Sequence, residues 1–145
     1  MLDRLAFGLL LVALAIPRIG AAQSVDLSKA LVGTWKGEVQ MASGTYPRTL
    51  VIKSVQQQGR QRFVEAEYGG PGGYGGGGTA KLEPVDVLVE TIGNDVMLRF
   101  RAEDLSPVEL SLYRDGRHLM GSVMVPAPTR GGSRSLSPIK LEKVD

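Results

Sequence analysis

Residues 85–102 read VDVLVETIGNDVMLRFRA and predict two strands joined by a tight turn. The turn falls at Gly93-Asn94, a dipeptide that suits a two-residue turn with positive φ. Closing the hairpin there gives one face the pairs Thr91–Val96, Val89–Leu98, Val87–Phe100 and Val85–Ala102. The other face holds the mixed pairs Glu90–Met97, Leu88–Arg99 and Asp86–Arg101. Because a slip of one residue would mix the two faces, the pattern determines the register.

A second hairpin follows in residues 107–125, PVELSLYRDGRHLMGSVMV, with its turn at Asp115-Gly116. Its apolar face holds the pairs Leu112–Leu119, Leu110–Gly121 and Val108–Val123, and its polar face holds Tyr113–His118, Ser111–Met120 and Glu109–Ser122. This hairpin therefore also presents one face to a core and one to solvent.

The other strands are shorter signals. In residues 31–40, LVGTWKGEVQ, alternation places Trp35, Gly37 and Val39 on the inner face of a strand. The runs 48–55 and 62–68 are joined by a Gln-rich turn that contains Gly59. An odd number of loop residues directs Leu50 and Ile52 inward, and an even number directs Val51, Lys53 and Val55 inward; we expect the odd count, which leaves Lys53 in water.

Two further runs complete the count. Residues 79–84, TAKLEP, predict a short strand, and residues 137–144, SPIKLEKV, predict the last one. The last strand contributes either Ile139 and Leu141 or Lys140 and Val144 to the core. Eight or nine sequential antiparallel strands close most economically into a single up-and-down barrel, and a two-sheet sandwich is the alternative. Trp35 then plugs the narrow end of the barrel, where Gly33 and Gly37 allow close backbone approach.

The start of the chain is typical of a secretory signal peptide. Arg4 precedes the apolar run 5–16, and small residues at Gly20 and Ala22 predict cleavage before Gln23. We therefore expect a signal peptide over 1–22, with a retained N-terminal anchor as the alternative, a lead-in over 23–30 and the barrel over 31–145. Removal of the leader takes Arg4, Arg18 and Asp3 from totals of 17 basic and 15 acidic residues, so the rest is nearly neutral.

Composition narrows the expected function. A nearly neutral domain has no strong attraction for nucleic acid, and a chain without cysteine has no thiol nucleophile or zinc–thiolate site. We expect no membrane span once the leader is cleaved, and a periplasmic or secreted bacterial protein.

The stretch LVGTWKGEVQMASGTYP, residues 31–47, resembles the opening of the lipocalin-like (calycin) barrels, and is most similar to the nitrobindin type, in which Gly-Thr-Trp is followed by Tyr-Pro. The closing LEKV, residues 141–144, is similar to the end of several of these barrels. The resemblance implies a barrel able to hold a small apolar ligand. It also implies a late basic side chain stacked on Trp35, for which Arg134 and Lys140 are the candidates.

The chain departs from each ligand-specific pattern in that group. The last strand, within SLSPIKLEKVD, has no histidine to bind haem, and a single tryptophan cannot form a biotin site of the avidin type. The later lipocalin motifs and their disulfides are absent. No specific ligand carries over, and we predict no cofactor.

Three segments carry functional alternatives. The run YGGPGGYGGGG, residues 68–78, is eight-tenths glycine over 69–78 and predicts either a loop without fixed structure or a flap with Tyr68 and Tyr74 at the barrel mouth. His118 lies too far along its strand from Ser122 for a catalytic pair, and Ser111 shares only an exposed face with it. RGGSR, residues 130–134, resembles an RNA-binding Arg-Gly-Gly box. Because the chain has a single copy of it, we expect a loop before the last strand instead.

We expect a non-enzymatic binding module for a small hydrophobic ligand. The candidate lumen lining is Trp35, Val39, Val87, Leu98, Phe100 and Leu110. The alternative is a cell-envelope structural or protein-interaction domain whose barrel is filled by side chains, with an unknown protein partner. Sequence volume does not distinguish a hollow barrel from a filled one.

Overall fold

The computed structural model describes residues 26–59, 61–71, 81–102, 106–125 and 131–145. One short helix, α1 (Leu27–Leu31), precedes the strands. The strands are β1 (Gly33–Met41), β2 (Gly44–Gln58), β3 (Gln61–Gly69), β4 (Leu82–Asp86), β5 (Leu88–Ile92), β6 (Asp95–Arg101), β7 (Pro107–Leu112), β8 (His118–Val125) and β9 (Ser135–Lys143). The leader prediction over 1–22 lies outside the described residues.

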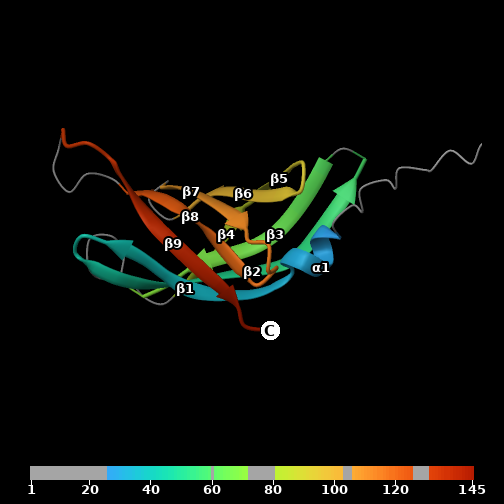
Figure 1. The fold of residues 1–145 in the computed structure, drawn as a ribbon, viewed down its shortest axis with the longest axis horizontal. Coiled ribbons are helices and arrows are strands. Elements are labelled where there is room, and N and C mark those ends of the chain that lie inside the picture. Colours follow the sequence, from blue (N-terminus) through green and yellow to red (C-terminus); the bar gives the residue numbers. More distant parts are fainter. Residues whose placement is uncertain (1–25, 60, 72–80, 103–105, 126–130) are drawn as a thin grey trace, which may run out of the picture.

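The strands form one antiparallel sheet in the order β4-β3-β2-β1-β9-β8-β7-β6-β5. Neighbours in the sheet are also neighbours in sequence, except where β9 returns to pair with β1, as Figure 1 shows. The two end strands, β4 and β5, are separated in sequence only by Val87. The sheet is therefore a nearly closed up-and-down barrel, which confirms the predicted fold class and strand number.

Both hairpins derived from the sequence are present. The β7–β8 ladder has Leu110 opposite Gly121, and the backbone N–H of Tyr113 donates to His118 O at 2.8 Å. In the first hairpin Gly93 has φ 62°, and the register places Val89 opposite Leu98. The predicted pairing is confirmed from the turn back to Leu88 and Arg99.

Beyond Leu88 the prediction is wrong. The β5–β6 ladder ends at Leu88–Arg99, and Asp86 lies opposite Glu65 of β3 instead. The expected pairs Val87–Phe100, Val85–Ala102 and Asp86–Arg101 are therefore not formed. The chain bends at Val87 because β3 also has a free edge to cover, and an unpaired edge is unfavourable. The sequence of the hairpin alone, residues 85–102, contains no information about the edge of β3.

The β2–β3 turn corrects a second expectation. Gln58 pairs with Gln61, so the loop between them is even, yet Leu50 and Ile52 are buried and Lys53 is exposed. A bulge between Ile52 and Ser54 explains this result, because one extra residue on β2 exchanges the two faces of the strand. The orientation of the strand was predicted correctly from the wrong loop length.

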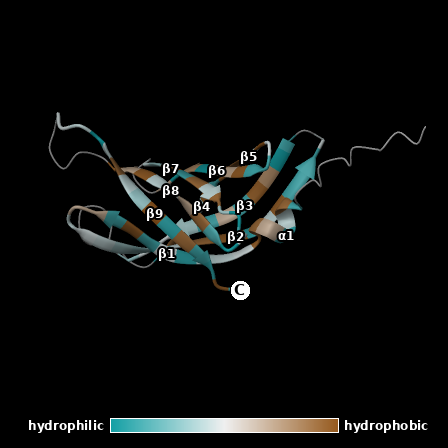
Figure 2. Ribbon diagram, viewed as in Figure 1, coloured by the Kyte–Doolittle hydropathy of each residue, from teal (hydrophilic) through white to brown (hydrophobic). Residues whose placement is uncertain are grey.

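The buried face forms one apolar core. Along the strands hydrophobic and hydrophilic residues alternate (Figure 2), and the last strand directs Ile139 and Leu141 inward. Gly37 lies close to the backbone of β9, since a Cβ there would meet Lys140 O at 1.8 Å. The expected role of Gly37 in close backbone packing is confirmed.

One end of the barrel is covered by α1, which sequence periodicity did not predict. Asp26 caps the helix by accepting from the Lys29 N–H at 3.3 Å. The Trp35 side chain is fully buried, and its Nε1 donates to Leu31 O at 2.9 Å, so α1 and the indole close this end together. The helix is a single turn and is held mainly by this contact and by its buried leucines.

The cation over the Trp35 ring is Lys143, with its Nζ 5.4 Å from the ring centroid. The expectation that Arg134 or Lys140 takes this place is therefore wrong. Lys143 lies directly opposite Trp35 in the β1–β9 ladder, and its Nζ also donates to Ala30 O at 3.3 Å. Nearby, the Thr34 N–H donates to the Asp145 carboxylate at 2.7 Å and lowers the pKa of Asp145.

Candidate functional site

All six residues predicted to line a lumen lie in the same buried core. Trp35, Val39, Leu98 and Leu110 are inaccessible to solvent, and Phe100 and Val87 are almost so. They pack against one another and against the other buried apolar side chains. The structure therefore brings the six predicted residues together, but their side chains fill the core instead of lining an open lumen.

Phe100 and Val87 differ from the other four because they also line surface grooves. Both lie close to the bend between β4 and β5, where the chain changes from pairing with β3 to pairing with β6. The Phe100 ring meets Tyr68 edge-to-face, with the centroids 5.0 Å apart. The accessible part of the predicted site is thus the part near the β4–β5 bend.

Tyr68 belongs to β3 and is buried, so it is part of the core rather than of a flap. Its register partners Leu50 and Glu83 are on β2 and β4. Tyr74, the other predicted flap residue, lies outside the described residues, as does most of the glycine-rich run 69–78.

The inner face also carries a charge that sequence reasoning missed. Arg48 is only 5 % exposed, and its Nη1 donates to the carbonyl oxygens of Pro47 at 2.7 Å and Pro71 at 3.2 Å. Alternation with Leu50 places Arg48 inward, and this was the signal in the sequence that could have found it. The interior therefore also contains a charged side chain, which the predicted apolar lining did not include, at the end of the barrel where the glycine-rich run begins.

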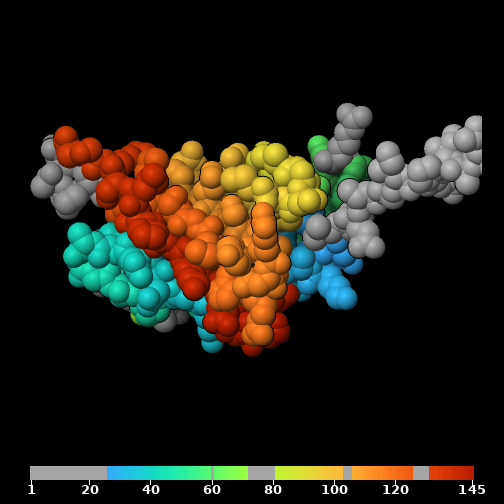
Figure 3. Space-filling view, viewed as in Figure 1, coloured from blue at the N-terminus to red at the C-terminus, as the bar shows by residue number. Residues whose placement is uncertain are grey.

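A groove with a volume of about 820 Å³ begins where β4 diverges from β6. We call it the fork groove. It is lined by Pro84, Val85, Asp86, Leu88, Arg99, Phe100, Arg101, Pro107, Val108, Glu109, Ser122, Met124 and Leu136. In Figure 3 the yellow atoms of β5 and β6 lie along the upper edge of the face, and the red atoms of β9 run from the upper left to the lower edge. Most of the lining is apolar.

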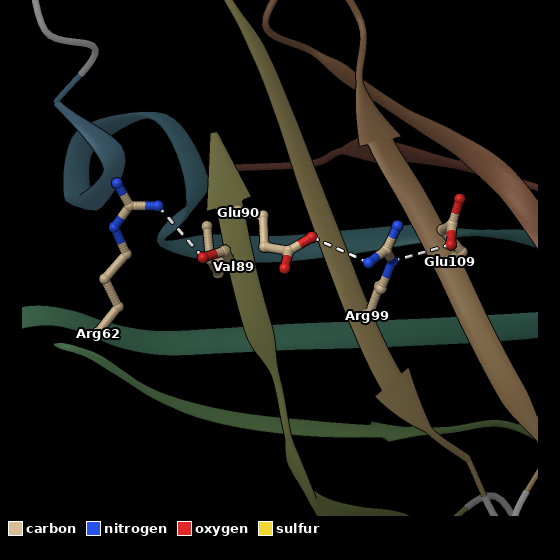
Figure 4. Close-up of polar contacts among 5 residues, drawn as sticks. All are labelled: Arg62, Val89, Glu90, Arg99 and Glu109. Atoms are coloured by element: carbon tan, nitrogen blue, oxygen red, sulfur yellow. Dashed lines mark hydrogen bonds and ion pairs between the residues drawn. The ribbon is translucent and has the colours of Figure 1, made fainter. Parts of the chain in front are cut away.

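The charges around the fork groove largely compensate one another. Arg99 lies between two carboxylates, with Nη1 2.9 Å from Glu90 and Nε 2.9 Å from Glu109 (Figure 4). Asp86 and Arg101 add one charge of each sign to the lining. A site with apolar walls and balanced charge favours a neutral ligand over an ionised one.

A second groove of about 410 Å³ lies on the other side of the same bend, and we call it the seam groove. It is lined by Ser54, Gln56, Arg62, Phe63, Val64, Glu65, Asp86 and Val87. Here β3 and β5 run close without pairing, and Arg62 bridges them, as Figure 4 shows in part. Its Nη1 donates to Val89 O at 3.2 Å and its Nη2 to Thr91 Oγ1 at 3.1 Å.

His118 lies at the β7–β8 turn, away from both grooves. Its Nδ1 is 2.5 Å from Asp115 Oδ2, and Asp115 also accepts from the backbone N–H of Arg117 at 2.8 Å. The Arg117 N–H, and next the His118 ring, lower the pKa of Asp115. The register places Ser111 opposite Met120 and Ser122 opposite Glu109. These contacts order the turn.

Among the described residues, no helix is long and apolar enough to cross a membrane. In the same part of the chain, histidine and carboxylate side chains do not gather in threes as a metal site would need. No protein-family model matches the chain, and no curated protein or solved structure matches it significantly.

Proposed function

We propose that this protein is a non-enzymatic binding module that takes a small, neutral, apolar molecule in the fork groove. The observation that carries the proposal is the groove itself, about 820 Å³ in volume, with mostly apolar walls and balanced charge. Grooves of this size suit ligands of a few hundred daltons. Phe100, which lines it, belongs to the residues that the sequence indicated.

Two further parts of the proposal rest on the sequence. The apolar leader supports export to the periplasm or the exterior. The Gly-Thr-Trp opening on β1 and the nearly closed antiparallel barrel support a lipocalin-like (calycin) relationship, with the nitrobindin type the most similar. The ligand site differs from a central lumen, because core side chains occupy the middle of the barrel.

Binding is tested with Nile red, a neutral apolar dye, and two matched variants. Ser122 and Ser111 both lie on the outward face of the β7–β8 hairpin, but only Ser122 lines the fork groove. Ser122→Trp puts an indole into the groove and is expected to weaken saturable dye binding by about tenfold or more, equivalent to about 1.4 kcal/mol. Ser111→Trp is expected to leave binding unchanged. Equal affinity in both variants, or no saturable binding to the wild type, contradicts the proposal.

A second function, a cell-envelope interaction domain, is favoured by a different observation. The fully buried Trp35, Val39, Leu98 and Leu110 fill the middle of the barrel, as expected of a scaffold that presents its surface to a protein. Native mass spectrometry of the protein purified from its own host separates the two functions. A bound small molecule supports the binding module, and a bound protein that survives Ser122→Trp supports the interaction domain.

A further inference from the structure

One edge of β5 has no partner strand in the described part of the sheet. β5 is an end strand, and its other edge pairs with β6. Along an antiparallel strand, successive residues direct their backbone N–H and C=O groups alternately toward the partner and away from it. Val89 O accepts from Arg62 Nη1 at 3.2 Å, on the side of β3 (Figure 4), so Val89 directs these groups away from β6, and Thr91 does the same. The two residues therefore present a polar backbone edge toward β3.

The first half of β3 lies on the other side of this space. β4 pairs with β3 only from Glu65 to Gly69, so residues 61–64 pair with β2 alone. Paired strands lie about 4.8 Å apart, which leaves no room for a side chain between their backbones. Here the Arg62 guanidinium reaches from β3 to the backbone of β5. The space between residues 61–64 and 88–92, which we call the edge gap, is therefore wider than a hydrogen-bonded pair of strands.

Large apolar side chains are exposed on both sides of the edge gap. Phe63 is 50 % exposed and Leu88 is 55 % exposed, and together they line a hollow of about 370 Å³. We call these two residues the apolar pair. Single exposed apolar residues are ordinary on a protein surface. An unpaired strand edge with exposed apolar side chains beside it, however, is a template for pairing with another chain.

The end of the edge gap nearest the bend is acidic. Glu65 and Asp86, the acidic pair, lie opposite each other in the β3–β4 ladder and both line the seam groove. Like charges directly opposite each other destabilise a sheet, so a cation placed beside them is favourable. Two other cations nearby are engaged, since Lys53 pairs with Glu67 at 3.0 Å and Arg62 donates to β5. Because side chains on one face of a strand recur every second residue, the acidic pair follows the apolar pair on the same outer face.

We propose that the edge gap is a docking site for an extended segment of a partner polypeptide, which adds a strand antiparallel to β5. The segment carries an apolar side chain for the apolar pair and, two residues later, a basic side chain for the acidic pair. Main-chain hydrogen bonds to Val89 and Thr91 supply affinity, and the two side-chain positions supply specificity. In the unbound protein the Arg62 guanidinium takes the place of a peptide N–H at Val89 O. The inference goes beyond the proposed function, because the edge gap lies on the other side of the bend from the fork groove.

The probe is a fluorescein-labelled, C-terminally amidated peptide, Thr-Val-Thr-Val-Leu-Thr-Lys, whose binding is followed by fluorescence anisotropy. Aligned antiparallel to β5, it places its lysine at the acidic pair, its leucine at the apolar pair and its fourth residue opposite Val89. We expect saturable binding with a dissociation constant of about 100 μM or tighter. Proline as the fourth residue removes the N–H that donates to Val89 O and is expected to weaken binding by about tenfold or more. Glutamate in place of the lysine is expected to weaken it by about threefold or more.

Two variants of Thr91 test the edge of β5 directly. Thr91→Pro removes an N–H that faces the edge gap and leaves the ladder with β6 in place, and proline is tolerated on an edge strand in this orientation. Thr91→Ala keeps the N–H but loses the same contact between Thr91 Oγ1 and Arg62, so it is the matched control. We expect peptide affinity to fall by about tenfold or more in Thr91→Pro and to stay at the wild-type value or rise in Thr91→Ala. Circular dichroism checks the fold of both variants, and if Thr91→Pro does not fold, the proline peptide on the wild type decides.

Three results overturn the proposal: no saturable binding of the parent peptide, equal affinity for the parent and proline peptides, or equal affinity of the two folded Thr91 variants. A second copy of this chain is the other candidate occupant of the edge. If the wild type and Thr91→Ala form dimers in sedimentation, Thr91→Pro does not, and the peptide does not bind, the edge serves self-association instead. Binding of Nile red in the fork groove is measured separately, so failure of either site leaves the other standing.

Discussion

Replacing Trp35 by phenylalanine tests how much the closed end of the barrel contributes to stability. Trp35→Phe keeps an aromatic ring on β1 but removes the Nε1–H that donates to Leu31 O at 2.9 Å. It also leaves a space in a position where the indole is fully buried. The change therefore affects the contact with α1 and the packing of the core, and leaves the strand pairing intact.

The size of the effect follows from these losses. A buried carbonyl left without its donor costs about 1–3 kcal/mol. The smaller ring gives up roughly 40 Å² of buried apolar surface, worth about 1 kcal/mol. Weakening the contact with Lys143, 5.4 Å from the ring centroid, adds about 0.5 kcal/mol. We expect the free energy of unfolding to fall by about 3.5 kcal/mol in total, taking about 2 kcal/mol for the hydrogen bond.

The measurement is urea unfolding followed by far-ultraviolet circular dichroism, because the variant has no tryptophan fluorescence. With a slope of about 1.5 kcal/mol per molar urea, the midpoint is expected to fall by about 2.3 M. Tyr113→Phe, which removes a hydroxyl from an exposed ring, is the matched control and is expected to change stability by less than about 0.5 kcal/mol. If both variants shift the midpoint equally, the indole does not close the barrel in the way described.

Three other variants test separate features. Gly37→Ala puts a Cβ at 1.8 Å from Lys140 O, so the β1–β9 ladder must separate; we expect a loss of about 2 kcal/mol or more in urea unfolding, and a loss below about 0.5 kcal/mol contradicts the close approach. Arg62→Ala removes the donor to Val89 O and is expected to cost about 1 kcal/mol and to speed amide exchange in β5 more than in β7; equal acceleration in both strands contradicts a local clasp. Asp115 has a lowered pKa in the folded state, so its stabilisation is present above the unfolded pKa and is lost as pH falls through the folded value. Thermal unfolding of Asp115→Asn is therefore expected to change less than that of the wild type between about pH 5 and pH 2, and parallel curves refute this.

The sequence predicts the local part of this fold well, for a physical reason. In each hairpin the turn residues and the alternation determine the same register independently, as with Gly93 and the pair Val89–Leu98. Trp35 was predicted to be buried because a large apolar side chain on an alternating strand has one stable direction. Such features depend on residues that are close together in the chain.

The features that the sequence did not predict depend on distant segments. Asp86 pairs with Glu65 because β3 has an edge to cover, which a hairpin pattern does not contain. Because of the bulge between Ile52 and Ser54, the length of the β2–β3 loop does not by itself determine which face of β2 points inward. Counting loop residues therefore predicted the correct inward face from an incorrect loop length. Arg48 faces the core because two carbonyl oxygens accept from its guanidinium, and one of them is 23 residues away.

The way the barrel closes links the fold to the proposed site. A barrel has no free edge only if every strand pairs on both sides. In this sheet β4 and β5 are the two end strands, so closure of the barrel depends on them. Because these strands are one segment bent at Val87, each covers only part of its neighbour, and a groove opens on either side of the bend. A straight strand in this place would pair along its whole length and fill both grooves. The two surface grooves therefore follow from the same bend that almost closes the sheet, and a change that straightens residues 84–88 should remove both together.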